Sequence, residues 1–229
     1  MIRMPAGIRS SLPLFSSLCL AWGVCFAQDV DTQVREHCPG VAAWEQRHLE
    51  AQVTEPDPHP TLPQVRLRLL DLEKKDQEIR RRFVEAREAP AVMREMIEVD
   101  AANLEQLRAI LARHGVPGTA QIGNDGVDAF WLLTQHASAD LALQKLVLAK
   151  LAGGDNGIDP SEIAMLTDRI RVSEGKPQLY GTQFHQVQGK LEPYPIEDAQ
   201  GVDVRRAQKG LMPLADYKCA LNASANPRG

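Results

Sequence analysis

The strongest constraint on the fold is a helical repeat of apolar residues over positions 64–113. Within 64–88 the apolar side chains recur at steps of three, four and seven residues, at Leu69, Leu72, Ile79 and Phe83. This spacing places them on one face of an α-helix. Pro90 breaks the pattern, because proline lacks the backbone donor that a helix interior needs. The pattern resumes over 91–113, so the sequence predicts two long helices, each with one apolar face.

Start and stop signals predict further helices and one hairpin. Asp159 and Pro160, followed by Glu162, are favoured residue types for a helix start. Residues 178–196 mix aromatic and β-branched residues, which indicates a two-stranded β-hairpin. The other helices are expected at 126–137, 139–152, 160–173, 202–209 and 213–221. The predicted fold class is therefore mainly α, or α+β at most: a helical array with one small β-hairpin near residues 178–196.

The leader at residues 1–27 has the features of a secretory signal peptide. Arg3 and Arg9 form a basic start, an apolar stretch follows, and Ala27 closes a cleavage site of small residues. The apolar stretch is too short to cross a bilayer. We expect cleavage after Ala27, a periplasmic or secreted location, and no stable membrane insertion after cleavage.

The remaining chain divides into three parts. Residues 28–63 are expected to form an N-terminal helical segment and a Pro-rich linker, because four prolines fall within 54–63. Residues 64–221 are expected to form a single helical domain with the hairpin. The small and polar residues 222–229 are expected to be a disordered tail.

Charge and cysteine content narrow the range of partners. Removal of residues 1–27 takes away two arginines and no acid, so the formal net charge falls from −4 to −6. We expect no nucleic-acid partner, because nonspecific binding to nucleic acid needs a basic surface. Only Cys38 and Cys219 remain, and two thiols in an oxidising compartment usually form a disulfide. The alternative is two free buried thiols.

Two aspartates interrupt the apolar stripes. Asp76 lies four residues after Leu72 and three before Ile79, and Asp100 interrupts the next helix in the same way. A buried carboxylate needs a partner, and Arg80 lies one helical turn from Asp76. Either these residues contribute to a shared polar pocket, or the aspartates lie at the stripe edge and reach solvent.

A second set of polar residues lies in and just after the helix at 160–173. It consists of Asp168, Arg169, Gln178, Tyr180, Thr182 and Gln183. These side chains offer hydrogen-bond donors and acceptors but no strong nucleophile. Residues 178, 180 and 182 would share one face of a strand, unless Gly181 bends it. The set is predicted to bind a ligand, and the alternative is an ordinary polar hairpin.

His136 is the best candidate for acid–base chemistry. Histidine titrates near neutral pH, and Asp140 lies one turn away from it. The alternative is a structural histidine that braces the corner between two helices. The histidines and cysteines lack the spacing of metal ligands, so we expect no metal and no cofactor.

Several short motifs occur in a fixed order along residues 64–221. They include Asp76-Gln77-x-x-Arg80, Trp131-Leu-Leu-Thr-Gln-His136, Leu166-Thr-Asp-Arg169 and Pro177-Gln-Leu-Tyr-Gly-Thr-Gln183. As an ordered set they resemble an uncharacterised bacterial domain family, the domain of unknown function 6624, with its Tyr-Gly-Thr-Gln signature. The resemblance implies a shared helical fold and a shared polar site, and it supplies no mechanism.

The sequence contains no phosphate-binding loop and no nucleophile elbow. We therefore expect a binding or interaction module, with a polar groove for a small polar ligand or a protein segment. One alternative is a hydrolase-type enzyme with His136 as general base. Another is an immunity or inhibitor protein that acts against a secreted toxin.

Overall fold

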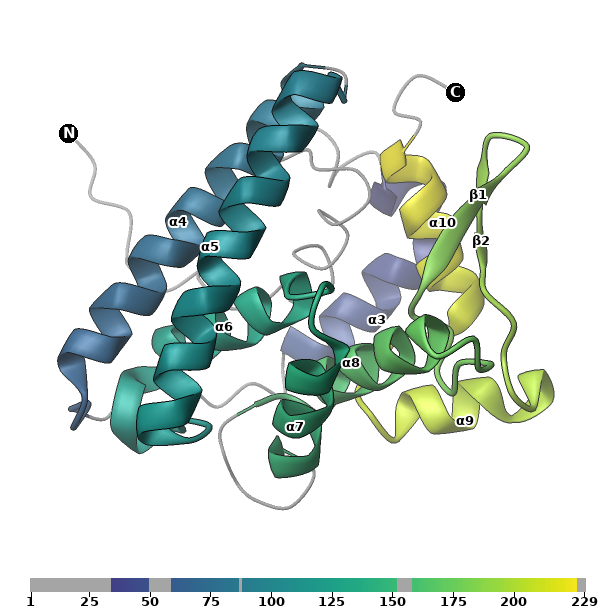
Figure 1. The fold of residues 1–229 in the computed structure, drawn as a ribbon. Helices are drawn as coiled ribbons and strands as arrows, with labels where there is room; N and C mark the ends of the chain where they lie inside the picture. Colours follow the sequence, from purple (N-terminus) through teal and green to yellow (C-terminus); the bar gives the residue numbers. More distant parts are fainter. Residues whose placement is uncertain (1–33, 50–58, 87, 152–157, 226–229) are drawn as a thin grey trace, which may run out of the picture.

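The computed structural model describes residues 34–49, 59–86, 88–151 and 158–225 (Figure 1). The predicted signal peptide and its cleavage site after Ala27 lie outside the described residues, as do linker residues 54–58 and tail residues 226–229. None of the helices within the four described ranges is long and apolar enough to cross a membrane. The described chain is mainly α-helical with a small antiparallel hairpin, as the sequence predicts.

Two long helices, α4 (Pro63–Glu85) and α5 (Pro90–His114), lie side by side (Figure 1). Each begins with a proline, which fits the first turn because the N–H that proline lacks has no helical acceptor there. Leu69 of α4 and Leu107 of α5 are completely buried. The apolar face of α5 is buried over only part of its length, since Ile97 on this face is 58% exposed.

Helix α6 (Thr119–His136) lies at the centre of the first apolar cluster. It begins earlier than residue 126, the expected start, because an additional turn precedes a kink at Gly123. The φ of Gly123 is 73°, a left-handed conformation that favours glycine. Residues 129–136 of this helix are all buried, so its C-terminal turn carries polar side chains into the interior: Thr134, Gln135 and His136.

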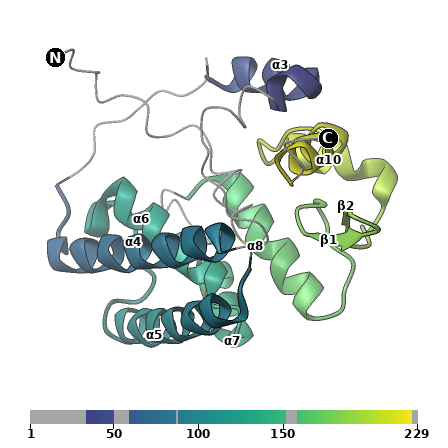
Figure 2. The same cartoon turned by 90° about the horizontal axis from the view of Figure 1, so that it is seen from above.

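Helices α7 (Leu141–Leu151) and α8 (Pro160–Ser173) follow. The predicted start of α8 is confirmed, since the Asp159 carboxylate accepts a hydrogen bond from a backbone N–H of the first turn at 2.7 Å. In Figure 2, α8 lies between the group formed by α4 to α7 and the group formed by α10 and the hairpin. Its side chains belong to both apolar clusters, Met165 to the first and Ala164 to the second. Helix α8 is thus shared by the two halves.

The β-hairpin is shorter than the sequence predicts. Strand β1 (Phe184–Val187) pairs antiparallel with β2 (Lys190–Pro193). The turn residues Gln188 and Gly189 both have positive φ, the geometry of a tight turn that matches the strand twist. Residues 178–183 were expected in the first strand, but they form a loop in which an isolated bridge at Gln178 is the sole strand-like pairing. The expected alternation of residues 178, 180 and 182 on one strand face is therefore wrong.

The second apolar cluster is built from the ends of the described chain. It combines α3 (Pro39–Leu49) and α10 (Leu214–Ala225) with side chains from the hairpin. Between the hairpin and α10 lie a short 3-10 helix, η1 (Ala199–Gly201), and helix α9 (Val202–Ala207). These elements surround one end of α8 (Figure 1).

Helix α10 continues past residue 221, where a disordered tail was expected to begin. The Asn222 side chain explains the extension. Its Oδ1 accepts the Leu191 N–H at 2.8 Å, and its Nδ2 donates to the Leu191 carbonyl at 3.0 Å. Both bonds attach the last turns of α10 to β2. Asn222 therefore satisfies backbone groups of a strand that would otherwise be left without partners.

A disulfide joins Cys38 to Cys219, so the predicted pair is present in the structure. Cys38 immediately precedes α3, and Cys219 lies in α10. The bond connects positions 181 residues apart in the sequence. It fixes α3 to the C-terminal helix and closes the second apolar cluster.

Candidate functional site

Asp76 lies at the centre of a buried polar network inside the apolar stripe of α4. Its side chain has no exposed area. Arg80, one turn further along α4, reaches Asp76 Oδ1 with Nη1 at 2.8 Å. The same guanidinium reaches Asp100 Oδ1 on α5 with Nη2 at 2.9 Å. Gln77 Nε2 donates to the second Asp76 oxygen at 2.9 Å, so both oxygens have partners. The predicted pairing of Asp76 with Arg80 is present, and it extends across two helices.

His136 joins this network from the end of α6. Its Nδ1 lies 2.7 Å from Asp76 Oδ1, and the ring is 4% exposed. Asp140, which lies one turn from His136 in the sequence, binds the Arg108 guanidinium at 2.7 Å and caps α7. The carboxylate that orients the ring is Asp76, 60 positions away in the sequence.

The His136 ring is neutral at neutral pH. Burial lowers its pKa from 6.5 to about 4, against the raising effect of Asp76; the positive charges of Arg80 and Arg169 lower it further. A neutral ring that donates from Nδ1 to Asp76 has a lone pair on Nε2. His136 Nε2 is buried and has no hydrogen-bond partner among the residues that the structure describes. The network therefore leaves one strong acceptor unused.

Arg169 on α8 contributes a positive charge that reaches His136 and lowers its pKa. Its Nε donates to Gln135 Oε1 at 2.7 Å. That bond fixes the orientation of the Gln135 amide, so that Gln135 Nε2 is a donor, and this nitrogen is buried without a partner. Arg169 has no carboxylate within ion-pair distance in the described chain. Desolvation lowers its pKa from 12.5 to about 10, which still leaves it charged at neutral pH.

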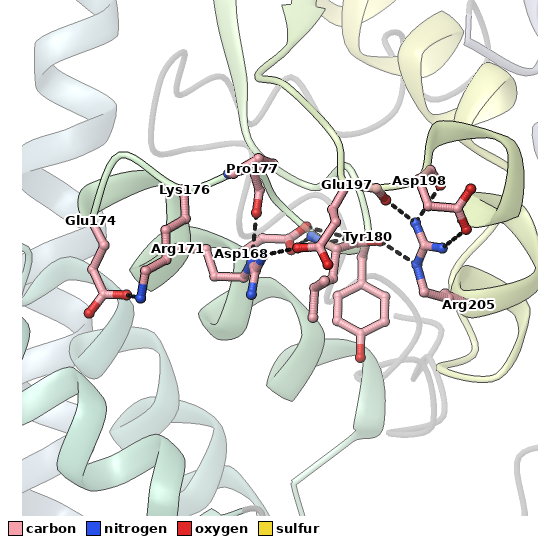
Figure 3. Close-up of polar contacts among 10 residues, drawn as sticks. Asp168, Arg171, Glu174, Lys176, Pro177, Tyr180, Glu197, Asp198 and Arg205 are labelled. Carbon is pink, nitrogen blue, oxygen red and sulfur yellow. Dashed lines mark hydrogen bonds and ion pairs between the residues drawn. The ribbon is translucent and has the colours of Figure 1, made fainter.

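Asp168, the neighbour of Arg169, faces the other half of the molecule and holds the loop at residues 178–183 (Figure 3). Its carboxylate accepts the backbone N–H groups of Leu179, Tyr180 and Thr182 at 2.6 to 3.1 Å, and the Thr182 hydroxyl at 3.0 Å. Burial raises the Asp168 pKa, while these hydrogen bonds lower it in part. The carboxylate is fully used inside the protein, which makes it a structural anchor.

The other predicted binding residues of the loop also bond within the chain. Gln178 Oε1 accepts the Gln183 N–H at 2.9 Å, and Gln178 Nε2 donates to the Gln183 and Tyr194 carbonyls. Gln183 Nε2 donates to the Thr182 hydroxyl at 3.1 Å. Figure 3 shows the Tyr180 ring directed away from these contacts. The polar groups of 178, 182 and 183 therefore close the loop, as the alternative of an ordinary polar segment implies.

Gly181 makes this loop geometry possible. Its φ is 68°, and a Cβ added there would lie 2.9 Å from Ile196 Cδ1 and from Leu214 Cδ1. A side chain would therefore clash as well as strain the backbone. Gly181 is therefore required by packing and by backbone conformation.

Three residues near the loop were not selected from the sequence as site residues. Arg205 donates to the Leu179 and Glu197 carbonyls (Figure 3). Arg206 is completely buried and donates to the Met212 and Tyr180 carbonyls, yet its Nη2 has no partner. Its guanidinium lies 5.0 Å from the centre of the Tyr217 ring. The sequence signal for Arg205 and Arg206 is two adjacent arginines in a short predicted helix. The same pattern is typical of ordinary solvent-exposed arginines, so it does not identify a buried arginine.

The predicted site residues thus fall into two networks on either side of α8. The first, here called the His136 network, contains His136, Asp76, Arg80, Asp100, Gln135 and Arg169. The second is the closed loop around Asp168. Gln135 Nε2 and His136 Nε2 are the unpartnered buried atoms of the His136 network in the described residues, whereas Arg206 Nη2 and Asn103 Nδ2 lie outside it. No group of three potential metal ligands occurs in the described ranges.

An open groove of about 520 Å³ lies elsewhere, between β2 and α10. It is lined by Lys190, Glu192, Ala215, Lys218, Cys219, Asn222 and Ala223. Among these, Lys218 and Glu192 form an ion pair with each other. None of the predicted binding residues lines this groove.

Comparison with known proteins gives one match. The family model of a family of unknown function (DUF6624) matches residues 63–226, which contain both networks. No curated protein and no solved structure matches the chain.

Proposed function

We propose that this chain, which belongs to the DUF6624 family, is a binding protein that holds a small polar ligand at the His136 network. The observation that carries the proposal is the buried His136 Nε2, which has no partner in the described chain although Nδ1 is held by Asp76. A buried polar atom without a hydrogen bond costs about 1–3 kcal/mol. A ligand that donates a hydrogen bond to Nε2 offsets this cost.

The surrounding contacts favour binding by a prepared site. Asp76, Arg80 and Asp100 fix one another across α4 and α5, so the imidazole cannot turn freely. Gln135 Nε2 adds an unused donor next to His136 in the sequence. Arg169 is half-buried and keeps contact with solvent, so a ligand would approach past its side chain. A fixed acceptor and a fixed donor that the described chain leaves without partners are features that specific small-ligand sites use.

A screen by ligand-observed NMR tests the proposal. The probes are small sugars, polyols, amino acids and hydroxy acids, offered to the wild type and to His136→Asn. The asparagine amide can still donate to Asp76, while the atom at the Nε2 position is lost. We expect compounds that bind the wild type at millimolar concentration or tighter and fail to bind His136→Asn.

The matched control is His114→Asn, which makes the same chemical change at the end of α5, outside the network. This variant should bind every compound that binds the wild type. The proposal is wrong if no compound binds the wild type, or if the compounds that bind it also bind His136→Asn equally well. Circular dichroism of each variant confirms that the fold is intact.

A second candidate function, a hydrolase-type enzyme, is favoured by the Asp76–His136 pair itself. A carboxylate that accepts from Nδ1 leaves Nε2 free to take a proton, which is the arrangement of a general base. A pKa of about 4 keeps that nitrogen unprotonated across the neutral range, although it also makes a weak base. Turnover of chromogenic ester, phosphoester or glycoside substrates, lost in His136→Asn, would establish this function. Absence of turnover on all three, or turnover that His136→Asn retains, would refute it.

Export is the third part of the proposal. We propose that the protein acts in the periplasm or outside the cell, after cleavage at Ala27, on the strength of the leader sequence. The Cys38–Cys219 disulfide supports an oxidising compartment. N-terminal sequencing of the exported protein should begin at Gln28, and retention of the intact leader in the cytoplasm would overturn this assignment.

The alternative of an immunity or inhibitor protein stays a prediction, because the contacts described above do not bear on it.

A further inference from the structure

We propose that the ligand of the His136 network is an oxyanion that also carries a hydroxyl proton, such as hydrogen phosphate or a hydroxy carboxylate. The inference rests on the proposed function and names its ligand class. Arg169 would bind the anionic oxygens, Gln135 Nε2 would donate to the same group, and the hydroxyl would donate to His136 Nε2.

The charge of Arg169 is the first reason. Within the described chain, its guanidinium has one hydrogen bond, to the neutral amide oxygen of Gln135, and no carboxylate partner. Charged groups that proteins withdraw from water are almost always paired. Arg80 meets that rule with two aspartates, whereas half-buried Arg169 has no carboxylate within ion-pair distance in the described residues. A bound anion would complete the pairing of Arg169.

The second reason is an excess of unused donors over unused acceptors. Gln135 Nε2 and Arg206 Nη2 are both buried donors without partners. Arg206 is also a cation with no ion pair in the described residues, and it lies against Tyr217. The charges of Arg206 and Arg169 both oppose the rise in the pKa of Tyr217 that burial causes, so both lie within electrostatic reach of this side chain. Their combined positive potential favours an anion over a neutral ligand of equal size.

The third reason is the protonation state of His136, which requires a ligand with a hydroxyl that can donate a hydrogen bond to Nε2. Its neutral ring offers Nε2 as an acceptor, and an acceptor repels a fully deprotonated oxygen. Hydrogen phosphate carries P–OH beside P–O⁻, and lactate carries a hydroxyl beside its carboxylate. Sulfate and propionate have similar shapes and charge but no such proton. The site should therefore discriminate between members of each pair.

Isothermal titration at pH 7.5 with four probes tests the ligand class on the wild-type protein. Inorganic phosphate is compared with sulfate, and lactate with propionate. We expect phosphate or lactate to bind at least tenfold more tightly than its matched anion. The inference is overturned if both members of each pair bind equally, because His136 Nε2 then plays no part in recognition.

Variants of Arg169 test the charge. Arg169→Gln should weaken binding of the preferred anion at least tenfold, and Arg169→Lys should restore part of it. Arg171→Gln is the control on the same helix, since Arg171 binds the Pro177 carbonyl and Glu197 outside the network. Unchanged affinity in Arg169→Gln would contradict the assignment. If Arg169→Gln does not fold, the comparison of phosphate with sulfate on the wild type decides the question alone.

The outcome also separates this inference from the proposed function. If neutral sugars or polyols bind the wild type and fail on His136→Asn, while none of the four anions binds, the site exists and the anion assignment is wrong. If neither the screen nor the anions give binding, both proposals fail.

Discussion

His136 Nδ1 lies 2.7 Å from Asp76 Oδ1, although 60 positions separate the two residues in the sequence. The contact joins the end of α6 to the middle of α4 inside an apolar interior. It sets the protonation of the imidazole, because the nitrogen that faces a carboxylate carries the proton. The same Asp76 oxygen also binds Arg80, so one oxygen holds both the cation and the ring in place.

Replacement of Asp76 by Asn should destabilise the protein by about 3 kcal/mol, because the loss of one partner leaves a buried charge on Arg80 poorly compensated. Urea denaturation followed by circular dichroism measures the change. Asp71→Asn, on the exposed side of the same helix, is the matched control and should have little effect. Equal stabilities of Asp76→Asn and the wild type would show that the network contributes nothing to folding.

Replacement of Asp168 by Ala should open the loop at residues 178–183 while α4 and α5 stay folded. The change removes the acceptor of the backbone N–H groups of Leu179, Tyr180 and Thr182. Hydrogen exchange at these three amides should accelerate at least tenfold, with a loss of about 3 kcal/mol in stability. Protection that remains as in the wild type would mean that the amides are held by other groups.

Glu162 should make stability fall as the pH rises. Burial, with the negative charges of Asp128 and Asp159, raises its pKa from 4.5 to about 8. Between pH 4.5 and pH 8, the Glu162 carboxyl keeps its proton in the folded protein, whereas the same group is ionised in the unfolded chain. The contribution of Glu162 to the free energy of unfolding is therefore fully present below pH 4.5 and is lost as the pH rises toward 8.

Thermal denaturation between pH 4.5 and pH 8 in wild type and Glu162→Gln measures this effect. The amide does not titrate, so the variant should lack the part of the decline that Glu162 causes. Glu174→Gln is the control, because the lysines that bind Glu174 lower its pKa to about 2, below the pH range of the experiment. Identical pH profiles for the wild type and Glu162→Gln would contradict the raised pKa.

Loss of the disulfide should lower stability substantially. In the chain-entropy description, a cross-link over 181 residues restricts the unfolded chain by about 5 kcal/mol. The double variant Cys38→Ser and Cys219→Ser should unfold at a lower denaturant concentration, and dithiothreitol should affect the wild type only. Equal denaturation midpoints for the double variant and the oxidised wild type would show that the bond adds no stability.

Local periodicity predicts much of the fold and part of the site. The pairing of Asp76 with Arg80 is predictable because both of its signals lie within one helix. One is a polar residue inside an apolar stripe, and the other is a partner one helical turn away. The start of α8 was predicted from Asp159 and Pro160 for the same reason. The cysteine pair follows from counting, since only two remain after the leader.

Contacts between distant segments were beyond these rules. Asp140 is the carboxylate nearest to His136 in the sequence, whereas tertiary packing supplies Asp76 from another helix. The loop 178–183 has residues that favour strands, but Asp168 binds its backbone N–H groups and removes them from strand pairing. Periodicity cannot reveal such a competitor, because the acceptor belongs to another element.

The most direct test of the account is a long-range ¹H–¹⁵N correlation spectrum of the His136 ring, assigned by comparison with His136→Asn. The account predicts a neutral ring at pH 7 with a protonated Nδ1 and a bare Nε2, and no conversion to imidazolium until the pH falls toward 4. A shift of the Nε2 resonance on binding of phosphate or lactate would identify that atom as the acceptor. An imidazolium at pH 7, or a proton on Nε2 in the free protein, would contradict the central claim that the Asp76–His136 pair presents an unused acceptor.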